Sequence, residues 1–291
     1  MIIKIVNFLK DLFSRKSLKN VSYDTKNILS YDNTIGSDNS QNDSFYCGAH
    51  KDIPDERDYI KEIELGVEKK YINLLEGVKF KPTYQGSTSA CTGHAMATFL
   101  TILYSKLDKG NVLKFNPYYI YYWNRMLAYG TIEHDRGCYL RETMQAVQKH
   151  GALTNELCSL NSVYKKPKDA EINKAHLLSI KNYFRLPYDN IYEAFVYTLV
   201  KERLPILTAL TVKQSEWEMA GKTGILDDYY PNNKETGGHA ICIYGYDPND
   251  DTFLAVNSWG ELWGNKGFFK ITKNGLIANV MDAWTVEYNY F

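Results

Sequence analysis

Four side chains in this sequence have the types that nucleophilic catalysis requires: a thiol, an imidazole and two carboxamides. Cys91 ends a short run rich in Gly, Ser and Thr, and apolar residues then recur every three or four positions, as in an amphipathic helix. Unpaired N–H groups at the start of a helix favour an anion. We therefore expect the pKa of this thiol to be lowered and its nucleophilic thiolate to be available. The alternative at this point is a buried structural cysteine.

Candidates for the other parts of such a site lie on both sides of this cysteine. His239 follows two glycines and begins an apolar, β-prone run, and Asn257 ends a second run of this kind. An asparagine amide can accept a hydrogen bond from an imidazole N–H and so orient the ring. Gln85 lies six residues before Cys91 and could donate its amide to an oxyanion beside the thiolate. His94 is a rival base, although it would lie beside the helix rather than across a cleft from the thiol.

Three motifs, in the same order along the chain, resemble the papain and cathepsin family of cysteine peptidases. They are Gln85 with Cys91, Gly238 with His239, and Asn257-Ser258-Trp259-Gly260 followed by Trp263-Gly264. The residues around the nucleophile, 88–92, lack the family's usual extra cysteine and tryptophan. Together with segment 52–59, they are similar to the branch of the family seen in bacteria and large DNA viruses. The resemblance covers about residues 51–291.

The resemblance implies a cysteine endopeptidase that acts on a polypeptide through a thioester acyl-enzyme. It assigns the nucleophile to Cys91, the base to His239, the orienting amide to Asn257, and the oxyanion to Gln85 with the backbone N–H of Cys91. It also implies that Gly137, Cys138 and Gly238 hold an extended substrate, although Cys138 could instead be a small buried thiol. The alternatives are an acyl transferase with the same Cys–His pair, and a catalytically silent peptide-binding or particle protein.

The periodicity predicts helices in the first half of the chain and strands in the second. Helical patterns begin at Cys91 and cover 117–125, 140–149 and 192–203, whereas 206–212, 239–246, 252–257, 267–272 and 283–288 are typical of strands. This order predicts an α+β fold with segregated layers. The resemblance implies a papain-like two-lobe fold, with a helical lobe carrying the Cys, an antiparallel β-barrel lobe carrying the His and Asn, and a cleft between.

The first fifty residues differ in character from the rest. Residues 1–16 carry an apolar helical face interrupted by charges, which favours a self-docking helix over a signal peptide. Residues 20–48 have the composition of a polar linker. We therefore expect an N-terminal extension over 1–50, either an inhibitory propeptide or a tether, and a peptidase domain over 51–291. No run reaches the length of a membrane span, so the expected location is intracellular, or inside a virion if the source is a virus.

Charge and cysteine usage exclude several other classes of function. The 291 residues carry 34 basic and 34 acidic side chains, so nothing indicates a nucleic-acid partner. The five cysteines show no zinc spacing and lack the family's partner for a bridge near the nucleophile, so we expect no metal, no cofactor and few or no disulfides. The remaining histidines, His50, His134, His150 and His176, stand among polar residues and are interpreted as surface residues.

Overall fold

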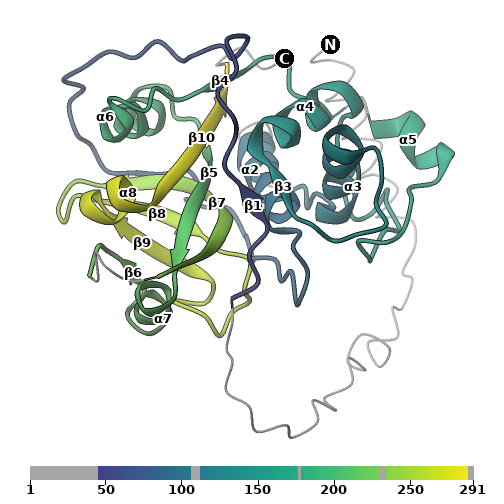
Figure 1. Ribbon diagram of the computed structural model, residues 1–291. Helices are drawn as coiled ribbons and strands as arrows, with labels where there is room; N and C mark the ends of the chain where they lie inside the picture. Colours follow the sequence, from purple (N-terminus) through teal and green to yellow (C-terminus); the bar gives the residue numbers. More distant parts are fainter. Residues whose placement is uncertain (1–44, 106–111, 176–177, 230–233, 288–291) are drawn as a thin grey trace, which may run out of the picture. The chain divides into compact units, whose positions relative to one another are not determined.

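The computed structural model describes residues 45–105, 112–175, 178–229 and 234–287. Residues Tyr46–Tyr290 form one compact unit, and the following account concerns that unit (Figure 1). The predicted helix over 1–16 lies outside the described residues. The boundary between 50 and 51 remains a prediction, although residues 46–50 belong to the compact unit.

A helical lobe is built around α2 (Cys91–Ser105), every residue of which is buried. It packs against α3 (Pro117–Tyr129) and α4 (Leu140–His150). Further along the chain, α5 (Asp169–Ala175) completes the helices of this lobe. The start of α3 is fixed by Pro117 in the first turn and by the Asn116 side chain, which accepts a hydrogen bond from the Tyr119 N–H at 3.0 Å. A Cβ on Gly93 would lie 2.5 Å from a backbone oxygen of α3, so glycine permits the close approach of α2 and α3. The predicted starts of all three long helices are confirmed.

The second lobe is an eight-stranded sheet. Its order is β4-β10-β5-β7-β8-β9-β6, and β2 pairs with β7 outside this path. The strands are β2 (Ile72–Asn73), β4 (Tyr183–Arg185), β5 (Ile206–Lys213), β6 (Ile225–Leu226), β7 (Glu235–Asp247), β8 (Thr252–Val256), β9 (Phe268–Thr272) and β10 (Val280–Val286). All pairs are antiparallel except β6 with β9. The five predicted strands are confirmed as β5, β7, β8, β9 and β10.

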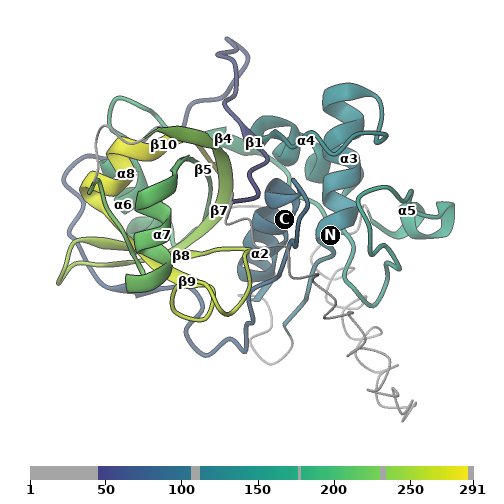
Figure 2. The same cartoon turned by 60° about the horizontal axis from the view of Figure 1, so that its bottom comes forward.

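Short helices complete the sheet lobe. They are α6 (Ile191–Val196) with the π-helical turn η3 (Tyr197–Lys201), α7 (Gln214–Thr223) and α8 (Lys273–Asn279). The helix expected over 192–203 corresponds to α6 and η3, whereas α7 and α8 were not predicted. The two lobes lie side by side, with α2 against β7 (Figures 1 and 2). The expected α+β fold in two lobes is therefore confirmed.

A short segment runs between the two lobes. Strand β1 (Ala49–His50) pairs in parallel with β3 (Cys138–Tyr139) of the helical lobe. On its other side, β1 contacts β7 and β5 of the sheet lobe. In Figure 1 it is the dark purple strand that descends between the lobes. We call residues Tyr46–His50 the strap.

Candidate active site

His239 and Asn257 are joined by the sheet. His239 lies on β7 and Asn257 directly follows β8, and these neighbouring antiparallel strands bring the two side chains together. The imidazole Nε2 is 2.7 Å from Asn257 Oδ1, which also accepts from the Ser258 N–H. An amide oxygen only accepts, so Nε2 carries the proton. The other nitrogen, Nδ1, is buried and has no hydrogen-bond partner among the described residues, which leaves it able to accept a proton.

Two tryptophans cover this pair. The Trp259 ring lies 4.3 Å from the His239 ring, and the Trp217 ring meets it edge-on at 5.6 Å, measured between centroids. His239 is completely buried as a result. Burial lowers its pKa to about 4, against the raising effect of the hydrogen bond to Asn257. Trp217 lies on α7, a helix that the sequence did not predict. Nothing in the sequence indicated that this side chain would pack against His239.

Cys91 begins α2 and contacts the same part of the sheet lobe. Its thiol is completely buried, and the backbone N–H groups of Ala240, Gly48 and Thr92 favour its ionised form. Ala240 is the residue after His239, so the thiol lies next to the imidazole-bearing part of β7. Burial nevertheless raises the pKa of Cys91 to about 12, and these N–H groups only oppose that effect. The expected lowering of the thiol pKa is therefore wrong for this state, because loss of water outweighs the helix N-terminus.

Gln85 is held rigidly beside the nucleophile loop. Its side-chain oxygen accepts from Ser258 Oγ at 2.7 Å, and its backbone N–H donates to the Ser258 carbonyl at 2.9 Å. The amide Nε2 donates to the Thr88 carbonyl at 2.7 Å and to the Tyr46 carbonyl at 3.3 Å. The predicted oxyanion donor thus contacts two peptide carbonyls, the nearer one in the nucleophile loop and the other in the strap.

The strap occupies the predicted substrate-binding residues. Its Gly48 N–H donates to the Gly238 carbonyl at 3.0 Å, and its Gly48 carbonyl accepts from the Cys138 N–H at 2.7 Å. A Cβ on Gly48 would lie 2.0 Å from the Ser89 carbonyl oxygen, and one on Gly137 would lie 2.2 Å from the Gly48 carbonyl oxygen. The space between the lobes at this point therefore admits little more than a peptide backbone.

A carboxylate connects the loop before the nucleophile to the residues that contact the strap. Asp135 accepts from the Ser89 N–H at 2.8 Å through one oxygen and from the Tyr121 hydroxyl at 2.6 Å through the other. The same hydroxyl accepts from the Gly137 N–H at 3.0 Å. This network fixes Gly137 relative to the loop that carries Cys91. The sequence placed Tyr121 in an aromatic core helix and gave no indication of this connection.

The segment after the strap is anchored to both lobes. Asp52 is 1% exposed and accepts from the Arg141 N–H at 3.1 Å and from Trp284 Nε1 at 3.2 Å. Arg141 also binds both carboxylate oxygens of Asp58, at 2.7 and 2.6 Å. Burial, with the adjacent Asp282 carboxyl, raises the pKa of Asp52 to about 9. Arg141 begins α4 and Trp284 lies in β10, so these bonds fix the chain directly behind the strap.

The rival base and the other histidines have different partners. His94 Nδ1 lies 2.8 Å from Thr83 Oγ1, and burial lowers its pKa to about 3. His50 is partly exposed, and its Nε2 lies 2.7 Å from the Arg136 carbonyl oxygen. The ring of His150 stacks on Trp123 at 3.7 Å.

His134 is exposed, as expected, and His176 lies outside the described residues. All five cysteines are free. Within the described ranges, no three His, Cys, Asp or Glu side chains gather in a way that could hold a metal ion. No described helix is long and apolar enough to cross a membrane.

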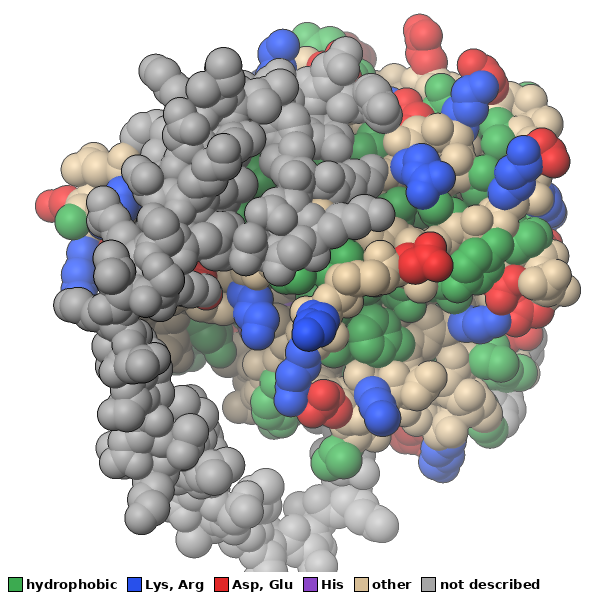
Figure 3. Space-filling model, turned by 180° about the vertical axis from the view of Figure 1, so that it is seen from behind, with side chains coloured by type: hydrophobic (Ala, Val, Ile, Leu, Met, Phe, Trp, Pro, Cys, Tyr) green, Lys and Arg blue, Asp and Glu red, His purple; other side chains and the backbone are tan. Residues whose placement is uncertain are grey.

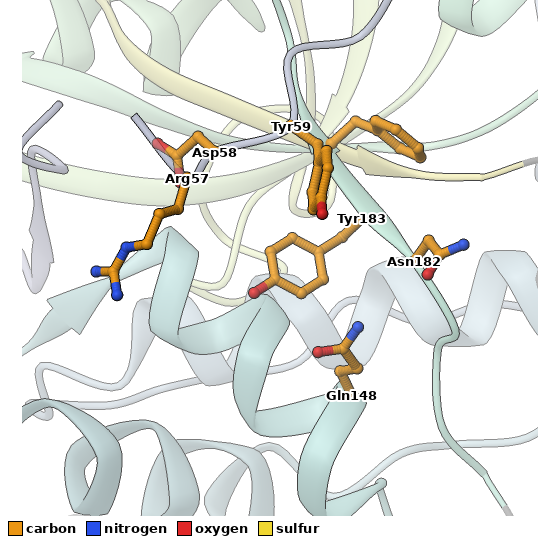
Figure 4. Close-up of a pocket in the computed structure, with 7 residues that line it drawn as sticks. Arg57, Asp58, Tyr59, Gln148, Asn182 and Tyr183 are labelled. Atoms are coloured by element: carbon orange, nitrogen blue, oxygen red, sulfur yellow. The ribbon is translucent and has the colours of Figure 1, made fainter. Parts of the chain in front are cut away.

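A separate hollow of about 430 Å³ lies where the segment after the strap meets β4 and α4 (Figure 4). Its lining includes Tyr59, Gln148 and Tyr183, and none of the predicted catalytic or substrate-binding residues. On the face seen in Figure 3, acidic and basic side chains are interspersed. This agrees with the neutral formal charge of the chain.

Comparison with known proteins identifies relatives of this arrangement. The profile of the papain family cysteine proteases matches residues 131–285, slightly more than half of the chain, including His239 and Asn257. An uncharacterized peptidase C1-like protein of Acanthamoeba polyphaga mimivirus is 28% identical over 217 residues, 70% of this chain and 68% of that protein. Cathepsin S of Mus musculus is 24% identical over 206 residues, 66% of this chain but only 54% of its own length.

Solved structures show the same fold. Xylellain, a cysteine protease from Xylella fastidiosa, superimposes with a TM-score of 0.73 at 22% identity, covering 83% of this chain and 96% of its own. Digestive procathepsin L 3 of the Tenebrio molitor larval midgut superimposes with a TM-score of 0.60 at 13% identity, covering 79% and 75%. A viral relative and a bacterial structure agree with the expected branch.

Proposed function

The chain belongs to the papain family of cysteine proteases, and we propose that it hydrolyses peptide bonds with Cys91, His239, Asn257 and Gln85. The observation that carries this assignment is the state of the imidazole. His239 donates its Nε2–H to the Asn257 side-chain oxygen, and its Nδ1 has no hydrogen-bond partner among the described residues. Its strand, β7, packs against α2, which begins at Cys91. A base with one nitrogen oriented and the other available is what a thiol nucleophile requires.

The reaction follows from these positions. Nδ1 of His239 takes the Cys91 proton, and the thiolate attacks the substrate carbonyl carbon. The oxygen then carries the negative charge and is stabilised by the Gln85 amide and by the N–H of Cys91, the first residue of α2, where N–H groups have no partner within the helix. The C–N bond breaks as His239 returns the proton to the leaving amine. A water molecule, deprotonated by His239, attacks the thioester and releases the acid and the Cys91 thiol.

The substrate is an extended polypeptide. The N–H of Cys138 and the carbonyl of Gly238 already bind a backbone of this kind in the strap. The strap also explains the unreactive protonation states, since Cys91 and His239 are neutral while it excludes water. The chain is therefore a latent precursor, and removal of the strap rehydrates the pair and permits thiolate formation.

The experiment compares the full chain with a chain that begins at His50. A peptidyl epoxide that alkylates thiols should label Cys91 in the shorter chain, and that chain should cleave a peptide library. A Cys91→Ala variant of the same length is the control. Labelling of a different cysteine, or cleavage that persists in Cys91→Ala, would refute the assignment.

The same experiment separates the alternative activities. An acyl transferase would give amide products in the presence of added amine and little hydrolysis without it. A catalytically silent binding protein would retain peptides without cleaving them. We expect hydrolysis at a rate that added amine changes little.

A further inference from the structure

The strap carries a second thiol into the region of the nucleophile. Cys47 is half-buried, and its Cβ and Sγ lie 2.9 and 3.4 Å from the position that a Cβ on Gly237 would take, two residues before His239. The preceding residue, Tyr46, places its carbonyl oxygen 3.3 Å from the side-chain amide of Gln85, which the proposed function assigns to the oxyanion beside Cys91. Cys47 is thus bracketed between the chain just before His239 and the amide assigned to the oxyanion.

The fit of Gly48 holds this arrangement in register. Its carbonyl and N–H bind opposite walls of the cleft, at Cys138 and Gly238. A Cβ on Gly48 would lie only 2.0 Å from the carbonyl oxygen of Ser89, two residues before Cys91. The backbone of the strap therefore lies directly against the loop that carries the nucleophile. A disulfide requires the two Cβ atoms to approach within about 4.5 Å, and the linked peptide in the test below reports whether Cys47 and Cys91 reach that separation.

Both thiols are protonated in the closed state. Burial raises the pKa of Cys47 to about 11 and the pKa of Cys91 to about 12. The base needed to deprotonate Cys91 is nevertheless present, because His239 Nδ1 has no other partner in the described structure. The pair therefore reacts only when an oxidant that can enter a narrow site is supplied.

We propose that Cys47 and Cys91 form an oxidisable pair, which a hydroperoxide converts into a disulfide that ties the strap to the nucleophile. This proposal rests on the proposed function in taking Cys91 as the reactive thiol. It makes the strap more than a removable cover. In the oxidised state, the strap remains attached to Cys91 even after the chain before it is cut.

The chemistry balances with one equivalent of peroxide. Cys91 loses its proton to His239, and the thiolate attacks one peroxide oxygen as the O–O bond breaks. The leaving hydroxide takes the proton from His239, which gives a sulfenic acid on Cys91 and one water molecule. The Cys47 sulfur then attacks the Cys91 sulfur, the S–O bond breaks, and the hydroxide leaves as water with the Cys47 proton. Two thiols are oxidised and one peroxide is reduced to two water molecules.

The reversibility of the product distinguishes this pair from a solitary nucleophile. A sulfenic acid without a nearby thiol proceeds to sulfinic acid, which ordinary reductants do not reverse. A disulfide returns to two thiols by exchange with an added thiol. We therefore expect peroxide to block epoxide labelling of Cys91 reversibly in the full chain, and irreversibly in a full chain without Cys47.

The test uses the full chain and hydrogen peroxide. After brief exposure, free thiols are blocked with N-ethylmaleimide, and the protein is digested without reductant. Mass spectrometry should find a peptide pair linked through Cys47 and Cys91, and dithiothreitol should restore epoxide labelling of Cys91. A Cys47→Ser variant should lose at least tenfold of this recovery and accumulate sulfinic acid on Cys91. A Cys158→Ala variant, altered in the helical lobe among Tyr119 and Leu153, should behave like the unaltered chain.

Two results would overturn the proposal. One is sulfinic acid on Cys91 of the full chain while Cys47 still reacts with maleimide. The other is equal recovery in the unaltered chain and in Cys47→Ser. Failure of the proposed function would appear differently: the linked peptide would form, but a reduced chain beginning at His50 would not cleave peptides.

Discussion

Substitution of Gly48 by alanine should open the active site without touching any residue assigned to catalysis. The new Cβ would lie 2.0 Å from the Ser89 carbonyl oxygen, which is much closer than two non-bonded atoms can approach. Because that oxygen is backbone, the strap must move away from its position in the cleft.

The size of the effect follows from the contacts that are lost. Moving Gly48 breaks two hydrogen bonds. Its N–H no longer donates to the Gly238 carbonyl at 3.0 Å, and its carbonyl no longer accepts from the Cys138 N–H at 2.7 Å. Each is worth about 1 kcal/mol net, so the closed state loses about 2 kcal/mol and its open fraction rises about 30-fold. The rate at which Cys91 is labelled cannot exceed the labelling rate of a chain that begins at His50.

The assay is the rate at which a peptidyl epoxide labels Cys91 in folded full-length protein, read by mass mapping. Gly66→Ala is the control for a general loss of stability: a Cβ there meets nothing within 4 Å, and the change strains only a left-handed backbone position (φ +76°) outside the strap. If Gly48→Ala labels at the rate of the unaltered chain while its circular dichroism is unchanged, the strap does not limit access to Cys91.

Four further outcomes are expected. A chain beginning at His50 should label at Cys91 at least tenfold faster than the full chain, and an unchanged rate would leave the first residues a docking role only. In that shorter chain, Gln85→Ala should lower kcat by a factor of roughly 10²–10³, and Gln85→Glu should lower it at least as much. Near-normal turnover of Gln85→Ala would mean that backbone N–H groups alone stabilise the oxyanion. Asp135→Asn should raise KM about tenfold with a smaller change in kcat, since the loss of one charge-assisted bond is worth about 1.5 kcal/mol; a fall in kcat alone would contradict a role in positioning the substrate strand. The folded state lowers the pKa of His239 to about 4, so the unfolded chain binds this proton first, and stability falls as pH falls from about 6.5 to about 4. Urea titrations should show a loss of unfolding free energy between pH 7 and 5 that is about 2 kcal/mol smaller in a His239→Gln variant, the remainder coming from His94, whose pKa is also lowered; an equal loss in both proteins would contradict the burial of a neutral His239.

The catalytic groups could be assigned from the sequence because their chemical types are rare and their spacing is wide. Cys91 heads a pattern of buried positions, and His239 and Asn257 border two strands whose pairing is short-range. Adjacent strands of this kind meet in most sheets, so the hydrogen bond between them follows from local order. The helices and strands around them carry the periodicities of buried faces.

The strap could not be predicted in the same way. Its contacts are made by backbone atoms of Gly48 and by a two-residue strand, so no side-chain periodicity records them. The polar run before it suggested a solvated linker, which placed the boundary after His50. The pKa of Cys91 was wrongly predicted for the same reason. The prediction considered a thiol at a helix start, but not the strap that removes water from that thiol.

The measurement that tests the central claim most directly is the identity of the residue that forms the acyl-enzyme. A chain beginning at His50 is mixed with a peptide ester, quenched with acid within the first turnover, and digested for mass spectrometry. The account predicts an acyl group of the substrate's mass on Cys91, absent in Cys91→Ala and persistent in His239→Gln only as a trace. Turnover of the ester with no acyl group on Cys91, or with the group on another cysteine, would contradict it.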